Sequence, residues 1–223
     1  MRLPVLNQII TGDALSMLPT LPPGSIDLLL TDPPYGNATS YGRERKRIAG
    51  DEHPLVGLQA VAACYPLLKS NTSAFVFCGA HHLGLIEHFL LRYTPFRMRE
   101  ILTWDKRMMG LGHGFRRSFE NIVVLEKGKP RYREKAIPTL LSVSRVNGGP
   151  HPHTKPVPLL ERLIAAASDP GDLVLDPFAG SGSTLVAAAN LGRRYLGIEV
   201  DPRYAEVARS RLGEIRESTS EAA

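Results

Sequence analysis

Short apolar runs alternate along the 223-residue chain with longer amphipathic segments. The apolar runs have strand length, and the amphipathic segments have helical spacing. Strands are predicted over Val5–Ile10, Ile26–Thr31, Ser73–Cys78, Met98–Trp104, Asn121–Glu126, Asp172–Leu175 and Arg194–Ile198. Helices are predicted over Pro54–Lys69, His82–Tyr93, Val157–Ser168, Ser183–Leu191 and Pro202–Arg216. This alternation predicts a single α/β domain over residues 1–223, with helices on both faces of the sheet.

Two stretches lack either period and are expected to be irregular. The first, Gly36–His53, carries a basic cluster, and the second, Lys127–Lys155, is rich in glycine and proline. Long loops of this kind in a small domain are usually functional. We therefore treat residues 36–53 as a basic loop and residues 127–150 as a short candidate region for recognising a target.

The apolar run DLLLT stops abruptly at TDPPYG, Thr31–Gly36. Proline cannot donate to a strand ladder, so two prolines end the strand and stiffen the turn that follows. Open α/β sheets bind ligands at the carboxyl ends of their strands. The turn therefore supplies four candidate catalytic residues, which are Asp32, Pro33, Pro34 and Tyr35.

The chemistry of this turn suits an aryl amine. The lone pair of such an amine is delocalised into the ring, which makes the nitrogen a poor nucleophile. The carboxylate of Asp32 and the carbonyl of Pro33 can each accept a hydrogen bond from one N–H group of the amine. Together these hydrogen bonds favour a pyramidal nitrogen. Tyr35 offers a flat face on which a base flipped out of a duplex can stack. A plain strand-ending turn is the alternative.

A second turn, DPFAGSGST at Asp176–Thr184, joins a predicted strand to a predicted helix. Gly180 and Gly182 allow the backbone to approach a ligand closely, and the helix directs its amino end toward that ligand. Glu199 ends the next strand, where a carboxylate can bind ribose hydroxyls. A loop-capping role is the alternative for Asp176.

The two turns together resemble the catalytic and cofactor motifs of the DNA amino-methyltransferases, which act on adenine N6 or cytosine N4. The catalytic motif comes first here, an order similar to that of the β-type enzymes. The resemblance covers roughly residues 5 to 212. It implies the Rossmann-like fold of S-adenosylmethionine-dependent methyltransferases, with a circularly permuted, seven-stranded sheet.

Two further segments carry the resemblance. HPHTKP before Val157 is similar to the HPTQKP segment that closes over the methionine end of the cofactor, although His153 and Thr154 depart from it. The segment GDAL places Asp13 near the adenine end of the cofactor, with a helix N-cap as the competing role. The residues that the resemblance assigns to S-adenosylmethionine are Asp13, Lys155, Pro156, Asp176, Phe178, Gly180, Gly182, Ser183, Thr184 and Glu199.

Charge agrees with a polyanionic partner without requiring one. The formal net charge is +5, and residues 92–135 hold twelve Lys or Arg against five Asp or Glu. A solvated surface is the alternative for each basic run. The residues predicted to contact nucleic acid are Arg43, Arg45, Lys46, Arg47, Arg116 and Arg117.

Other features narrow the class of protein. Cys64 and Cys78 lie in apolar segments, so we expect buried free thiols, and no Cys or His spacing predicts a metal site. The amino terminus lacks a signal-peptide core and no apolar run is long enough to span a membrane, so a cytoplasmic protein is expected.

The resemblance implies adenine-N6 methylation of double-stranded DNA with base flipping, because DPPY is more usual in adenine enzymes. Cytosine-N4 methylation is the nearest alternative. RNA or protein substrates, a DNA-binding module without activity and a nicotinamide dehydrogenase are weaker ones. Homodimers are common among such enzymes, so a homodimer stays open. No nuclease motif is present, and a place in restriction–modification is one role the resemblance implies.

Overall fold

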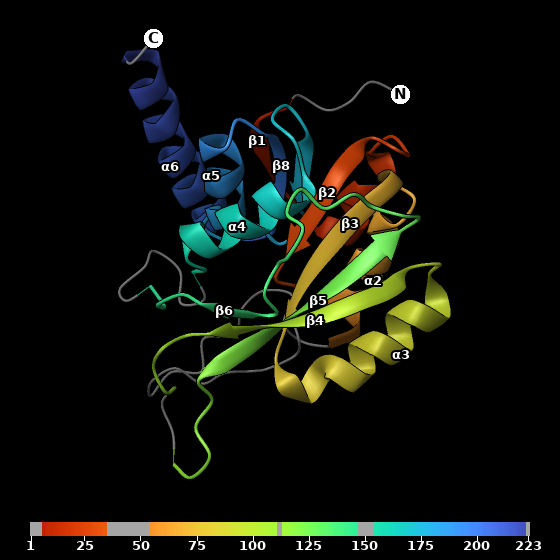
Figure 1. Cartoon of the computed structure of the whole chain (residues 1–223). Helices are drawn as coiled ribbons and strands as arrows, with labels where there is room; N and C mark the ends of the chain where they lie inside the picture. The colour runs from red at the N-terminus through yellow and green to blue at the C-terminus, as the bar shows by residue number, and fades with distance from the viewer. Residues whose placement is uncertain (1–5, 35–53, 111–112, 147–153, 222–223) are drawn as a thin grey trace.

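An eight-stranded sheet forms the centre of the computed structural model (Figure 1). The structure describes residues 6–34, 54–110, 113–146 and 154–221. The strands are β1 (Gln8–Thr11), β2 (Ile26–Thr31), β3 (Leu68–Cys78), β4 (Arg97–Asp105), β5 (Phe119–Lys127), β6 (Leu140–Ser142), β7 (Leu173–Asp176) and β8 (Arg194–Glu199). Their order across the sheet is β1-β8-β7-β2-β3-β5-β4-β6. In the described chain β5 runs antiparallel to both of its neighbours, and all the other pairs are parallel.

Helices cover both faces of this sheet, as predicted. One face carries α4 (Val157–Ala167), α5 (Ser183–Asn190) and α6 (Pro202–Glu221), and the other carries α1 (Ala14–Met17), α2 (Pro54–Cys64) and α3 (Leu83–Tyr93). Short 3-10 turns, η1 (Leu18–Thr20) and η2 (Ala80–His82), follow α1 and precede α3. The α/β class read from the sequence is therefore confirmed.

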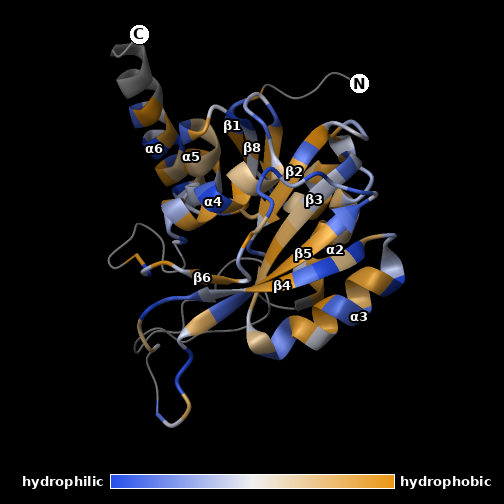
Figure 2. Ribbon diagram, viewed as in Figure 1, coloured by the Kyte–Doolittle hydropathy of each residue, from blue (hydrophilic) through white to orange (hydrophobic). Residues whose placement is uncertain are grey.

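The strand β2 shows why the central runs are continuously apolar. Leu28 and Leu30 pack into the core under α4, α5 and α6, whereas Ile26 and Leu29 pack into the core under α1, α2 and α3. A strand buried on both faces needs apolar residues at successive positions. Figure 2 shows the same result, with hydrophobic residues concentrated along the central strands.

Two predicted elements have different bounds. The helix expected over Pro54–Lys69 ends at Cys64, and β3 begins at Leu68. Pro66 explains the error, because proline has no N–H for a helical hydrogen bond and disfavours helical backbone in the residue before it. The strand expected over Val5–Ile10 is observed at Gln8–Thr11, after Asn7 with its left-handed φ of 60°.

The prediction of seven strands was wrong, because the sheet has an eighth at its edge. The additional strand, β6, pairs in parallel with β4 and lies in the stretch expected to be irregular. It spans only Leu140–Ser142, of which Leu141 alone is buried. Three residues are too few to display a strand period. The Trp104 indole reinforces the pairing by donating to the carbonyl of Val143 at 2.8 Å.

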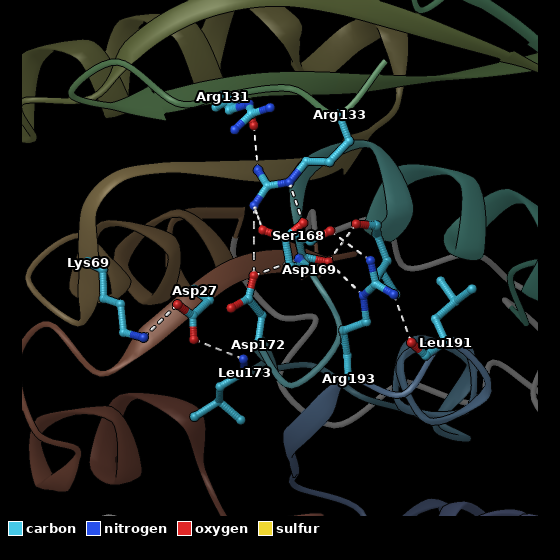
Figure 3. Close-up of polar contacts among 11 residues, drawn as sticks. Asp27, Lys69, Arg131, Arg133, Ser168, Asp169, Asp172, Leu173, Leu191 and Arg193 are labelled. Carbon is cyan, nitrogen blue, oxygen red and sulfur yellow. Dashed lines mark hydrogen bonds and ion pairs between the residues drawn. The ribbon is translucent and has the colours of Figure 1, made fainter.

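The stretch 127–150, considered for target recognition, starts at the edge of the sheet opposite the carboxyl ends of the parallel strands, because β5 is antiparallel. There Arg133 forms an ion pair with Asp169 at 2.5 Å, and Arg193 donates to the carbonyl of Ser168 at 2.7 Å. Figure 3 shows this network beside the pair formed by Lys69 and Asp27. The chain then returns through β6 to the carboxyl edge, so its first part holds connections together far from the catalytic turn.

The connections diverge between β7 and β2. The chain passes from β7 through α5 to β8 on one side, and from β2 through α2 to β3 on the other. Ligands of open α/β sheets bind at such a switch point, outside the carboxyl ends of the strands. Both turns singled out in the sequence follow these two strands.

Candidate active site

Asp32 and Asp176 stand at the carboxyl ends of the adjacent strands β2 and β7. Leu28 and Leu29 of β2 pair with Val174 and Leu175 of β7, which brings the two turns to one point. The hydroxyl of Thr31, the last residue of β2, donates to Asp176 Oδ1 at 2.8 Å. Two segments separated by more than a hundred residues therefore share a single hydrogen-bonded edge.

Asp176 is a buried carboxylate, with 4% of its surface exposed. Burial raises its pKa to about 6, against the opposing effect of hydrogen bonds from Thr184, Thr31 and the Phe178 amide. The Phe178 N–H donates to Asp176 Oδ1 at 3.1 Å, which fixes the start of the glycine turn. The loop-capping role considered from the sequence is thus observed.

The glycines of this turn serve different purposes. Gly180 has φ 52°, and among the residues that the structure describes a Cβ there would meet no atom within 4 Å. Gly182 has φ 79°, and a Cβ there would lie 2.7 Å from the Cβ of Ala208 in α6. The absence of a side chain at Gly182 therefore permits close packing of loop and helix, a purpose that the sequence interpretation did not separate from ligand approach.

Arg211 of α6 also supports the glycine turn and was not identified from the sequence. Its Nη1 donates to the carbonyl of Ser181 at 2.6 Å and to the hydroxyl of Ser183 at 3.2 Å. Burial lowers the pKa of this guanidinium, although Glu214 opposes the shift. Nothing in the helical pattern of α6 marks this arginine, because its partners lie elsewhere in the chain.

Glu199 closes the other side of the turn. Its Oε2 accepts from the Gly180 N–H at 2.8 Å, and its Oε1 accepts from the Asp201 N–H at 2.8 Å. Burial raises the pKa of Glu199, and these hydrogen bonds partly offset that rise. Asp13 lies after the neighbouring strand β1, where its Oδ2 accepts from the Ser16 N–H at 2.9 Å. Asp13 is therefore the N-cap of α1, the competing role, and its contact with a cofactor remains a prediction.

Lys155 contacts the catalytic turn. Its ammonium, with 11% of the side chain exposed, donates to Asp32 Oδ2 and lies 3.3 Å from Glu120 Oε2. Glu120, at the start of β5, also accepts from Lys106 at 2.5 Å. The four side chains form a row of alternating charge, which we call the charge row: Lys106, Glu120, Lys155 and Asp32.

Two members of this row, Lys155 and Glu120, have pKa values shifted toward their charged forms. Burial would lower the pKa of Lys155, but Asp32 and Glu120 outweigh it and raise that pKa. Burial would raise the pKa of Glu120, but Lys155 and Lys106 outweigh it and lower that pKa to about 2. Sequence reasoning did not connect these residues, since Asp32, the β4–β5 pair that carries Lys106 and Glu120, and Lys155 are far apart in the chain.

The catalytic turn packs tightly against α2. A Cβ at Gly57 would lie 2.6 Å from the carbonyl oxygen of Pro34 and 2.8 Å from the Cβ of Pro33. Pro33 is buried and Pro34 is half-buried. A glycine inside a helix is a sequence signal for close backbone packing, and it could have identified Gly57.

Pro156 is the N-cap residue of α4, and its carbonyl accepts from the amide of Leu159 at 3.1 Å. The segment that ends at Pro156 therefore forms the entry to helix α4. Phe178 packs partly buried on the core, and Ser183 and Thr184 are buried at the start of α5. Of the residues that the sequence assigns to a cofactor, those from Asp176 to Thr184 span the turn from β7 to α5, and Glu199 is hydrogen-bonded to that turn. Asp13 instead follows β1, Pro156 begins α4 and Lys155 contacts Asp32.

Arg116 and Arg117 lie on the exposed segment between β4 and β5, which rises from the carboxyl edge of the sheet. Arg116 donates to the carbonyl of Gly110 at 2.7 Å, and the same segment exposes Met109 and Phe115. Five other predicted site residues fall outside the described part of the chain: Tyr35, Arg43, Arg45, Lys46 and Arg47.

The thiols are buried and free, as predicted. Burial, Asp32 and Glu120 raise the pKa of Cys78 to about 12, and burial raises that of Cys64 further, so neither is a ready nucleophile. In the described ranges, no group of three or more His, Cys, Asp or Glu could hold a metal ion. No helix within those ranges is long and apolar enough to cross a membrane.

These residues fit a nucleoside cofactor. Within the described part of the chain nothing lies within 4 Å of a Cβ built at Gly180, and Glu199 beside it carries the acceptor oxygens that ribose hydroxyls require. Fold and site together are those of an S-adenosylmethionine-dependent methyltransferase. A family model described as DNA methylase, for N6 and N4 methyltransferases, matches residues 26–144 and 136–210. The chain belongs to this DNA methylase family.

Similar proteins and a similar solved structure agree with this family assignment. The chain is 31% identical to YubD of Escherichia coli (strain K12) over 220 residues, covering 98% of this chain and 95% of YubD. It is 26% identical to the DNA adenine methyltransferase YhdJ of the same organism, covering 92% of this chain and 82% of YhdJ. The crystal structure of an M1.HpyAVI–SAM complex matches with a TM-score of 0.73 and 26% identity, covering 92% of this chain and 98% of that one.

The two glycines of the cofactor turn are expected to respond differently to alanine. Gly182→Ala should lower the free energy of unfolding by about 2 kcal/mol or more, because a left-handed backbone and a clash with Ala208 add together. Gly180→Ala should lower it by about 1 kcal/mol, the backbone cost alone. Urea denaturation of both variants measures the difference, and equal losses would contradict the distinction.

Asp176→Asn should change how stability depends on pH. The Asp176 pKa is about 6 in the folded protein and near 3.8 in the unfolded chain, so the folded state binds the proton more tightly. The free energy of unfolding of the wild type, relative to the variant, should therefore fall as pH rises from about 4 to about 6, by on the order of 3 kcal/mol. Above pH 6 the difference should be constant. Denaturation curves at several pH values test this, and a pH-independent difference would refute it.

Proposed function

We propose that the protein methylates the N6 amine of adenine in double-stranded DNA. The observation that carries the proposal is the position of Asp32, beside the glycine turn and joined to it through Thr31 and Asp176. This proximity supports a site in which Asp32 accepts hydrogen bonds from an amine beside a methyl donor bound at the glycine turn.

The cofactor is S-adenosylmethionine, which supplies an electrophilic methyl group when bound. Gly180 would let its nucleoside approach the backbone, and Glu199 would hold the ribose hydroxyls. Asp13 would reach the adenine end of the cofactor, as its place after β1, next to β8, suggests. Phe178, Ser183 and Thr184 would complete the pocket, and Asp176 would orient the turn.

Asp32 would act on the target amine. Its carboxylate and the carbonyl of Pro33 would accept hydrogen bonds from the two N–H groups of the amine, which favours a pyramidal nitrogen with a free lone pair. Holding this nitrogen in line with the methyl group supplies the main catalytic advantage, since alignment replaces a chance encounter. Tyr35 would stack on the base after it leaves the duplex.

DNA contact is proposed for the basic residues near this edge. Arg116 and Arg117 lie on the exposed segment after β4, where they could reach phosphates without moving the sheet. DNA contact is also proposed for Arg43, Arg45, Lys46 and Arg47, on the basis of their charge alone. Binding through phosphates weakens as salt increases.

We also infer that the chain is a circularly permuted member of its family. In support, the catalytic turn precedes the cofactor turn, and the amino-terminal strand β1 lies beside β8 from the other end of the chain. The part of 127–150 that follows β6 is the remaining candidate for target recognition. Cytosine-N4 methylation is the alternative activity, because the family model covers both kinds of enzyme.

The proposed activity is tested with isotope-labelled S-adenosylmethionine and mixed-sequence duplex DNA, followed by digestion to nucleosides. We expect label in N6-methyladenine, and a loss of at least about 100-fold in Asp32→Ala, because the amine loses its acceptor. Asp169→Ala is the matched control, since Asp169 is an exposed carboxylate at the opposite edge. It should retain activity.

Label in N4-methylcytosine would overturn the assignment of the base and keep the reaction. Absence of label in DNA, with cofactor bound, would overturn the DNA substrate.

A further inference from the structure

The charge row contains more ions than the proposed chemistry uses. Only Asp32 is needed to accept an amine, yet Lys155, Glu120 and Lys106 are arranged behind it from three other segments. The Lys155 ammonium also lies 5.1 Å from the centre of the Phe77 ring, which shields it further from water. Burying a charge is costly unless it is paired, so this arrangement needs a purpose.

We propose that Lys155 is a positioning residue for Asp32, an inference that rests on the proposed function. Its ammonium fixes Asp32 Oδ2 and leaves Oδ1 to accept the target amine. Glu120 shares the same ammonium, so the positive charge is divided between two carboxylates and Asp32 stays a strong acceptor. Lys106 in turn holds Glu120 in place.

Because the charges in the row alternate in sign, the proposal predicts a different effect for the loss of each one. Removing Lys155 leaves Asp32 and Glu120 facing each other without a cation, which favours protonation of one of them. Removing the Glu120 charge leaves the Lys155 ammonium paired with Asp32 alone, which disfavours protonation of Asp32. Removing Lys106 strengthens the hold of Glu120 on Lys155 and weakens the contact of Lys155 with Asp32.

Other groups near Asp32 are the same in every variant. Asp176, at the end of β7, and the Cys78 thiol, at the end of β3, both interact electrostatically with Asp32. Lys155 comes from the segment before α4, Glu120 lies in β5 and Lys106 directly follows β4. Differences between variants therefore report the row itself.

The experiment uses the full chain, labelled S-adenosylmethionine and duplex DNA over a range of pH. For each variant, kcat, KM for DNA, the Kd of S-adenosylmethionine and thermal unfolding are measured. Variants are Lys155→Met, Lys155→Arg, Glu120→Gln and Lys106→Met. Lys69→Met is the matched control, because it removes a lysine from the ion pair with Asp27 at the opposite edge.

We expect Lys155→Met to lower kcat by roughly tenfold or more and to move the acidic limit of activity up by about one pH unit. Lys106→Met should move that limit up by less, and Glu120→Gln should move it down. Lys155→Arg should recover part of kcat, the control should match the wild type, and the cofactor Kd should stay within about twofold throughout.

If the acidic limit of activity moves in the same direction in all row variants, or does not move, the positioning role is overturned. A Lys155→Met defect confined to the Kd of S-adenosylmethionine would also overturn it. If Lys155→Met does not fold, the opposite shifts of Glu120→Gln and Lys106→Met decide the question. A wild type that does not label DNA would overturn the proposed function together with this inference. A wild type that labels DNA with all variants equal to it would overturn this inference alone.

Discussion

The parallel pairing of β2 with β7 is the constraint on which the site depends. It brings the ends of two strands from distant parts of the chain to one place, and the hydrogen bond from Thr31 to the buried Asp176 joins their turns. The glycine turn then takes its shape from Asp176, Glu199 and Arg211. Asp32 is held at the same edge, so the acceptor proposed for the target amine lies beside the turn proposed to bind the cofactor.

Local patterns in the sequence predicted much of this arrangement. Continuous apolar runs identified the central strands because these strands are buried on both faces, as Leu28 and Leu29 illustrate. The prolines after Asp32 and the glycines around Gly180 marked both turns, since backbone requirements restrict those positions to few residue types. Pro66 carried a similar signal for the end of α2, which the helical spacing of its neighbours obscured.

Contacts between distant segments were not predictable in this way. The pairing of Lys155 with Asp32 and Glu120 was not predicted, because no local period connects these residues. Arg211 and Ala208 support the glycine turn from α6, and the edge strand β6 has too few residues to show a period. The missed features share one cause, because each depends on which segments the sheet brings together.

The central claim is that the glycine turn and Asp32 form one site. A crystal structure of the protein with S-adenosylmethionine tests it most directly. The account predicts the cofactor over Gly180, with its ribose at Glu199 and its methyl group facing Asp32. A cofactor bound away from the glycine turn, or one whose methyl group faces away from Asp32, would contradict the account.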